Sequence, residues 1–168
     1  MSAEDEATVT LQMQRPPRGV AGVAHRCPCG KPSVVATLPR LADGTPFPTT
    51  YYLTCPRATS ACSTLESQGV MTEMTARLQT DGELAGAYRK AHEAYLHDRA
   101  ELGEVPEIAG VSAGGMPDRV KCLHVLVAHS LAAGPGVNPL GDEALRTLGE
   151  FWRRPCLTDD LGPAGEVR

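Results

Sequence analysis

The first third of the chain carries short runs of alternating or β-branched residues, a pattern that is typical of β-strands. Such runs occupy residues 20–26, 33–38 and 49–54, and turn-forming Gly, Pro and Asp residues separate them at residues 27–32 and 43–48. Together they predict a small antiparallel sheet of about three strands within residues 20–55.

The rest of the chain follows the three-to-four-residue periodicity of helices. Helices are expected at residues 59–68, 70–78, 82–102 and 142–152. The strongest signal spans residues 117–133, between Pro117 at its start and Gly134-Pro135 at its end. Its apolar side chains point in every direction around the axis, so we expect this central helix to be buried on most sides. The predicted fold class is therefore α+β, with the sheet packed by four or five helices.

The length and the ends of the chain indicate one globular domain. A chain of 168 residues can build a single stable core without disulfides. Three acidic residues at positions 4–6 and the pair Pro16-Pro17 predict a flexible arm over residues 1–18. The domain is expected to span residues 19–153, and residues 154–168 are expected to form a flexible tail.

Charge and hydropathy exclude several classes of protein. A formal net charge of −4 argues against a general nucleic-acid binder. No apolar run approaches the ~20 residues that span a bilayer, so we expect no membrane insertion. The acidic N-terminus does not resemble a secretory signal. We therefore expect a cytoplasmic protein in which the six cysteines are free thiols or metal ligands rather than disulfides.

Cysteine and histidine residues are the main candidate chemistry. Zinc prefers four nitrogen or sulfur ligands in a tetrahedron. Cys27 and Cys55 each precede a proline at the end of a predicted strand, and Cys122 can approach them from the central helix. With Zn–S bonds of ~2.3 Å, these three sulfurs are predicted to converge within ~4 Å of a common point. His129 is the predicted fourth ligand. The alternative ligands are His124, Cys29 and His25.

The positions of these residues along a helix argue against a single metal site that contains both Cys122 and a histidine of the same helix. In a regular helix Cys122 and His129 lie ~10.5 Å apart along the axis, and Cys122 and His124 point ~200° apart around it. The alternative is that the cysteines are ordinary buried residues of the core. Cys62 and Cys156 are expected to lie away from any metal site.

The main functional hypothesis is a binding or structural protein that contains zinc and could have a protein partner. Two enzyme hypotheses are the alternatives. Cys122 would be a thiol nucleophile if the helix dipole and the nearby Arg119 and Lys121 lower its pKa, with a histidine as base. The glycine-rich loop at residues 110–121 could instead bind an anionic, phosphate-containing ligand through the amides of Gly114 and Gly115, assisted by Arg119 and Lys121. No catalytic residue is assigned from the sequence.

Four segments resemble an uncharacterised, largely actinobacterial family, domain of unknown function 501. They are RCPCGKP at residues 26–32, DGTPFPTTYYLT at 43–54, LESQGVM at 65–71, and GMPDRVKCLH at 115–124 with its continuation through His129 to NPLG at 138–141. The resemblance spans about residues 18–148 and implies a cytoplasmic bacterial protein of unestablished activity. In the family pattern position 55 is Cys or His, an exchange that a metal ligand tolerates, whereas position 29 is not usually Cys.

Overall fold

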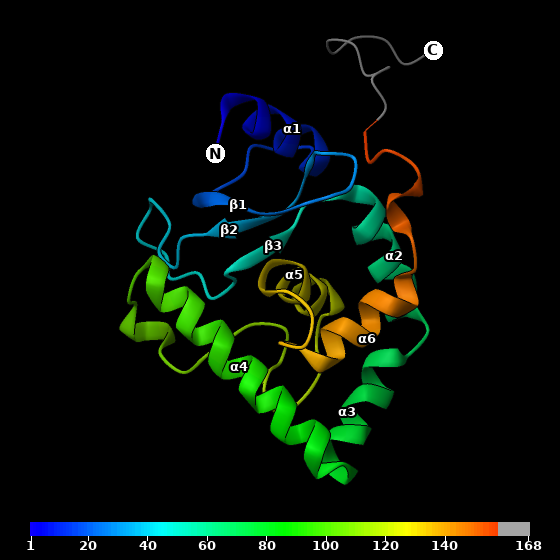
Figure 1. Cartoon of the computed structure of the whole chain (residues 1–168). Helices are drawn as coiled ribbons and strands as arrows, with labels where there is room; N and C mark the ends of the chain where they lie inside the picture. The colour runs from blue at the N-terminus through cyan, green and yellow to red at the C-terminus, as the bar shows by residue number, and fades with distance from the viewer. Residues whose placement is uncertain (158–168) are drawn as a thin grey trace.

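The fold, in a computed structural model that describes residues 1–157, is α+β, as the sequence predicts (Figure 1). Strands β1 (Val20–Arg26), β2 (Pro32–Thr37) and β3 (Tyr51–Leu53) form one antiparallel sheet in the order β1-β2-β3. Val23 pairs with Val35, and Val34 pairs with Leu53, so β2 is hydrogen-bonded on both edges. This sheet confirms the three predicted strands.

Six α-helices accompany the sheet within residues 1–157. They are α1 (Ala3–Met13), α2 (Pro56–Ser67), α3 (Val70–Thr80), α4 (Gly82–Leu102), α5 (Leu123–Ala133) and α6 (Pro139–Leu148), with short 3₁₀ turns η1 (Pro106–Ile108) and η2 (Phe151–Arg153). In Figure 1, α5 lies under one face of the sheet and α1 lies over the other, while α2, α3 and α6 lie to the right of α5 and α4 lies below it to the left. No helix of this described part is both long and apolar enough to cross a bilayer.

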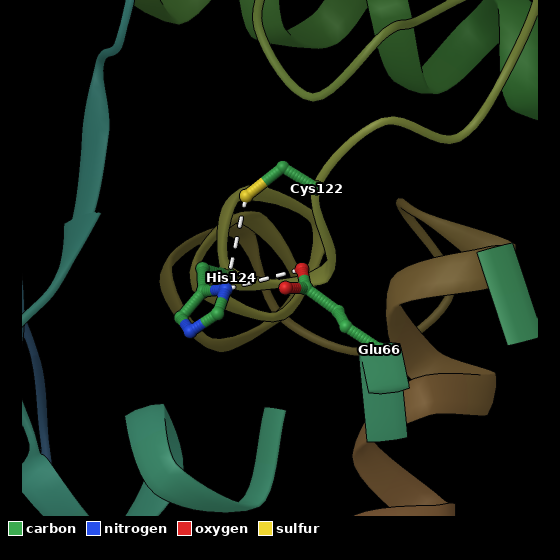
Figure 2. Close-up of side chains that lie close together, drawn as sticks. All are labelled: Glu66, Cys122 and His124. Carbon is green, nitrogen blue, oxygen red and sulfur yellow. Dashed lines mark hydrogen bonds and ion pairs between the residues drawn. The ribbon is translucent and has the colours of Figure 1, made fainter. Parts of the chain in front are cut away.

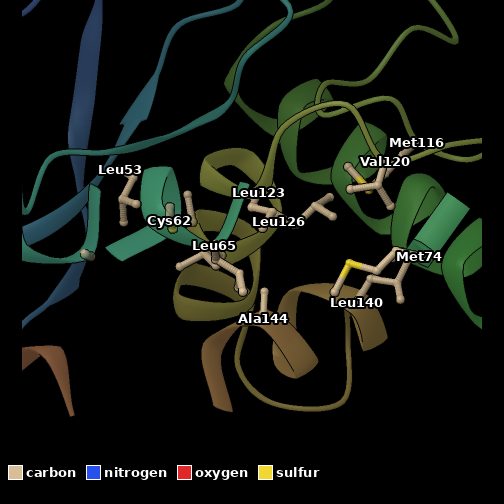
Figure 3. Packing of buried hydrophobic residues seen from close by; sticks show 14 of the residues in the cluster. Leu53, Cys62, Leu65, Met74, Met116, Val120, Leu123, Leu126, Leu140 and Ala144 are labelled. Carbon is tan, nitrogen blue, oxygen red and sulfur yellow. The ribbon is translucent and has the colours of Figure 1, made fainter. Parts of the chain in front are cut away.

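Helix α5 is the centre of the apolar core, as the sequence predicts. Leu123, Leu126, Val127 and Ala128 are fully buried, and side chains from α2, α3, α6 and the sheet pack around them (Figure 3). Because apolar residues surround the whole axis of α5, the helix is stable only inside such a shell.

The predicted start of this helix is wrong by six residues, because α5 begins at Leu123. Residues 117–122 form a turn and an extended segment instead of the first helical turns. The N–H of Arg119 donates to the carbonyl of Gly115 at 3.1 Å, and the N–H of Lys121 donates to that of Gly114 at 2.7 Å. Both glycines have positive φ, which most other residues avoid, so the chain turns here before the helix begins.

The predicted flexible arm is corrected, because residues 3–13 form helix α1. Ser2 caps this helix by accepting the N–H of Asp5 at 3.1 Å, and the acidic residues occupy its first turn, where the helix dipole favours negative charge. Val9 is fully buried, and the carboxylate of Asp5 accepts two hydrogen bonds from Arg26 at 2.8 and 2.9 Å. The acidic residues that predicted a flexible arm therefore form the first turn of a packed helix.

The last predicted helix, at residues 142–152, starts earlier and ends earlier than expected. Asn138 caps α6 by accepting the N–H of Gly141 at 2.9 Å, and Pro139 occupies the first helical position. The helix ends at Leu148, and η2 follows. Of the predicted tail at 154–168, Cys156 is buried, and residues 158–168 lie outside the described residues.

Candidate functional site

Three potential metal ligands meet where the end of α2 approaches the start of α5 (Figure 2). Within residues 1–157, Glu66, Cys122 and His124 are the one group of three or more such residues whose ligand atoms all lie within 4.8 Å of one another. The Nδ1 atom of His124 lies 3.1 Å from Oε1 of Glu66 and 3.8 Å from Sγ of Cys122. All three residues are partly buried.

The local chain path explains why these side chains converge. Cys122 is the N-cap residue of α5, but its thiol accepts no hydrogen bond from the first turn of the helix. The carboxylate of Glu66 takes that role from α2, because its Oε1 atom accepts the N–H of Leu123 at 2.6 Å. The positive end of α5 therefore holds the Glu66 carboxylate beside Cys122 and His124.

Contacts at the Nε2 side of the His124 ring fix the orientation of the ring. Its Nε2 atom lies 3.2 Å from the carbonyl oxygen of Thr59 and 3.3 Å from Oγ of Ser63. A carbonyl oxygen only accepts hydrogen bonds, so Nε2 carries a hydrogen and Nδ1 is the nitrogen that faces the other two groups. The interaction with Cys122 and the charge of Glu66 raise the pKa of His124 to about 9, against the opposing effect of burial.

A cavity of about 570 Å³ opens beside the site. Cys122 and His124 form part of its wall, and Tyr51, Tyr52 and Arg15 form another part. The Arg15 guanidinium lies 6.0 Å from the centre of the Tyr52 ring and donates to its hydroxyl at 3.3 Å. A cationic group therefore forms part of the cavity wall. The cluster therefore borders a space that a small molecule or a peptide side chain could enter.

The predicted fourth ligand, His129, lies elsewhere in the core. Its ring is fully buried between Tyr51 and Tyr95, with ring centres 5.8 and 5.1 Å away. Its Nδ1 atom accepts a hydrogen bond from the Asn138 side chain at 3.2 Å, and within the described residues Nε2 has no partner. Cys122 precedes α5 instead of lying within it, so the separations that a regular helix would impose between Cys122 and the two histidines do not apply.

Cys27 and Cys55 do not join Cys122, so the predicted quartet is not assembled. Strand β2 separates the two strands that these cysteines follow, although both lie at the same end of the sheet. The alternative ligand His25 forms a 2.6 Å hydrogen bond with Ser33. Cys29, the remaining alternative, has its sulfur 3.8 Å from that of Cys156, which was expected to lie apart from any site.

The residues proposed to bind an anion are also arranged differently. The N–H groups of Arg119 and Lys121 close turns onto Gly115 and Gly114, so the turn uses them internally. The loop does not lead directly into a helix, because α5 begins only at Leu123. The N-terminus of α5 already has an anionic partner, the carboxylate of Glu66. The anion that this N-terminus attracts therefore belongs to the chain itself.

Glu66 is the one potential ligand of this group that the sequence did not indicate. It lies 56 residues before Cys122, in a helix whose polar positions gave no sign of a partner. Its one signal is its place in the LESQGV segment of the family resemblance. Cys62, one turn earlier on α2, is fully buried, and burial together with the charges of Glu66 and Cys122 raises its pKa to about 12.

Comparisons with known proteins give one match. No curated protein and no solved structure matches the chain. A family model described as "Protein of unknown function (DUF501)" matches residues 23–146, which include all three residues of the Glu66, Cys122 and His124 cluster. Since this match covers most of the 168 residues, the chain belongs to the DUF501 family.

Proposed function

We propose that the protein binds a zinc ion through Glu66, Cys122 and His124 and functions as a metal-containing binding protein. The observation that carries the proposal is the convergence of a carboxylate oxygen, a thiol sulfur and an imidazole nitrogen within 4.8 Å. These are the three ligand types that zinc accepts, and the thiol makes magnesium or calcium a poor fit.

The surroundings of the ligands support the same proposal. The hydrogen bond from His124 Nε2 to the Thr59 carbonyl leaves Nδ1 as the nitrogen available for coordination, as in many zinc sites. The N–H of Leu123 holds the Glu66 carboxylate in position. A zinc ion would take the place of the proton that Nδ1 carries in the metal-free chain, so zinc uptake would release a proton.

Three protein ligands leave one tetrahedral position for another group. Zinc sites with three protein ligands keep a fourth position for water or a ligand, in contrast to closed structural sites. The cavity beside Cys122 and His124 would give that group access to the ion.

Free cysteines support a reducing compartment, so the cytoplasm is the proposed location.

Metal analysis of untagged protein tests the proposal. Cys122→Ser and His124→Gln are each expected to bind about one zinc ion fewer per chain than the wild type, because each loses a ligand. His97→Gln is the matched control, since this exposed histidine of α4 lies outside the cluster. Equal zinc content in the wild type, Cys122→Ser and His124→Gln would refute the proposal.

A thiol enzyme is the second candidate, and the position of Cys122 favours it. Cys122 lies at the N-terminus of α5, borders the cavity, and has His124 Nδ1 at 3.8 Å. However, Glu66 approaches the same nitrogen as the thiol, whereas in a catalytic triad the carboxylate binds the other nitrogen of the base. The arrangement therefore suits a shared ion better than a proton relay.

Alkylation with iodoacetamide separates the two candidates. A zinc-bound Cys122 would be protected, and a chelator would make it reactive while the buried Cys62 stays unmodified. A thiol enzyme would instead show rapid alkylation of Cys122 at neutral pH with or without added zinc.

A further inference from the structure

Four cysteines gather at the end of the sheet that faces the C-terminal segment. Cys27 and Cys29 lie in the turn between β1 and β2, and Cys55 follows β3 as the N-cap residue of α2. The register brings these segments to the same end, since Arg26 pairs with Pro32 and the N–H of Cys55 donates to the Ser33 carbonyl at 3.4 Å. Cys156 lies near the C-terminal end of the described residues.

The sulfurs of Cys29 and Cys156 lie 3.8 Å apart, and Cys55 and Cys156 also belong to the apolar core. The thiol of Cys27 is near enough to affect the pKa of Cys29. Cys55 is close enough to interact electrostatically with both Cys27 and Cys156. We call Cys27, Cys29, Cys55 and Cys156 the four-thiol cluster.

A hydrogen-bond donor reaches the cluster from α1. The Nε2 atom of Gln12 donates to the sulfur of Cys156 at 3.4 Å. Backbone N–H groups near Cys27 and Cys29 oppose the effect of burial on the pKa of these two thiols. Such donors stabilise a metal-bound thiolate.

We propose that the four-thiol cluster binds a second zinc ion, in a closed site that fastens the C-terminal segment to the sheet. A tetrahedron with Zn–S bonds of ~2.3 Å places its sulfurs ~3.8 Å apart, which is the separation of Cys29 and Cys156. Four soft sulfur ligands favour zinc over hard cations. No three of these sulfurs lie within 4.8 Å of one another, so binding requires side-chain rotations that draw the cluster together.

The two zinc sites would have different roles. The four-thiol site takes all its ligands from the protein, so it would be structural, whereas the site at Cys122 keeps a position for a ligand. Cys156 lies beyond the family match at 23–146, so closing this site recruits a segment outside the family domain. Cys29 and Cys156 thus complete a site that Cys27 and Cys55 alone could not form.

The experiment uses the full-length, untagged chain carrying Cys122→Ser, purified with a phosphine reductant, so that the result does not depend on the other site. This chain is expected to bind about one zinc ion, and adding Cys156→Ser should abolish that binding. Adding Cys62→Ala instead should leave the zinc content unchanged, because Cys62 is a buried residue of α2 outside the four-thiol cluster. With cobalt(II) as probe, the expected sign is strong thiolate-to-cobalt charge-transfer absorption, lost with Cys156→Ser.

Two results would overturn the proposal. One is a Cys122→Ser chain that binds no more zinc than the double variant. The other is a Cys29–Cys156 disulfide that forms without reductant and that prior addition of zinc does not prevent. If Cys156→Ser does not fold, alkylation of the wild-type chain decides. Zinc should protect all four thiols together and a chelator should expose them, whereas unchanged protection after chelation would mean that burial alone shields them.

Discussion

At the scale of single residues, His129 shows how strongly the core controls a titratable group. Its ring is fully buried between two tyrosines, and within the described residues its Nε2 atom has no hydrogen-bond partner. Burial lowers the pKa of His129 from 6.5 to about 4, although the nearby Asp98 and Asp142 oppose this effect. The histidine is therefore neutral in the folded chain at neutral pH.

The free energy of unfolding is expected to fall as pH decreases from about 6.5 to about 4, because in this window the unfolded chain binds a proton at position 129 that the folded chain does not. The loss attributable to His129 is roughly 3 kcal/mol. Urea unfolding at several pH values should therefore show a shallower pH dependence for His129→Gln than for the wild type. His97→Gln is the control on an exposed histidine, and a slope for His129→Gln equal to that of the wild type would contradict the assignment.

At the scale of secondary-structure elements, the crossing of α5 and α6 depends on a single glycine. A Cβ atom added to Gly141 would overlap the Leu126 carbonyl oxygen and the Ser130 hydroxyl of α5. The Ser130 hydroxyl in turn donates to the carbonyl of the buried Asn138 at 3.2 Å. The backbones of the two helices thus approach each other more closely than any larger residue would permit.

Gly141→Ala is expected to lower the free energy of unfolding by roughly 2–3 kcal/mol, because the helices must move apart to admit the methyl group. Gly86→Ala is the matched control on α4, where an added Cβ would meet nothing within 4 Å. There the change should stabilise the protein by about 0.5–1 kcal/mol through higher helix propensity. Chemical unfolding of both variants tests the contrast, and similar effects at the two positions would show that the crossing is not tight.

At the scale of the whole molecule, α1 completes the layer over the sheet, although it precedes the family match at 23–146. Three contacts hold it there: the buried Val9, the ion pair of Asp5 with Arg26, and the 2.7 Å hydrogen bond from Gln12 to the Pro32 carbonyl. The Arg26 guanidinium holds the pKa of Asp5 well below its usual range. Gln12 also contacts Cys156, so α1 links the N-terminal and C-terminal segments.

Val9→Ala is expected to lower the free energy of unfolding by about 2 kcal/mol, because it removes two buried methyl groups. Leu11→Ala on the same helix should change it by less than ~0.5 kcal/mol, since Leu11 is 54% exposed. Limited proteolysis should also cleave the segment after α1 faster in Val9→Ala than in Leu11→Ala. Equal stability and equal cleavage would mean that α1 is not part of the folded unit.

The sequence by itself determined the strands, the long helix α4 and the apolar helix α5, because each depends on a local periodicity of side chains along the chain. Helix ends were less predictable. The start of α5 depends on the turn at Gly114 and Gly115 and on a cap from Glu66, which is distant in sequence. The acidic residues before Val9 are equally compatible with a disordered arm and with the first turn of a helix, and only packing on the sheet distinguishes the two.

The candidate sites divide in the same way. The sequence indicated Cys122, His124 and His129 as candidates, because thiols and imidazoles inside an apolar segment stand out from their neighbours. Only the tertiary structure decided their partners. Glu66 joins Cys122 and His124 through the packing of α2 on α5, and Cys156, near the end of the described residues, lies beside Cys29. Ligand sets are assembled by contacts between distant segments, and no periodicity within one segment encodes those contacts.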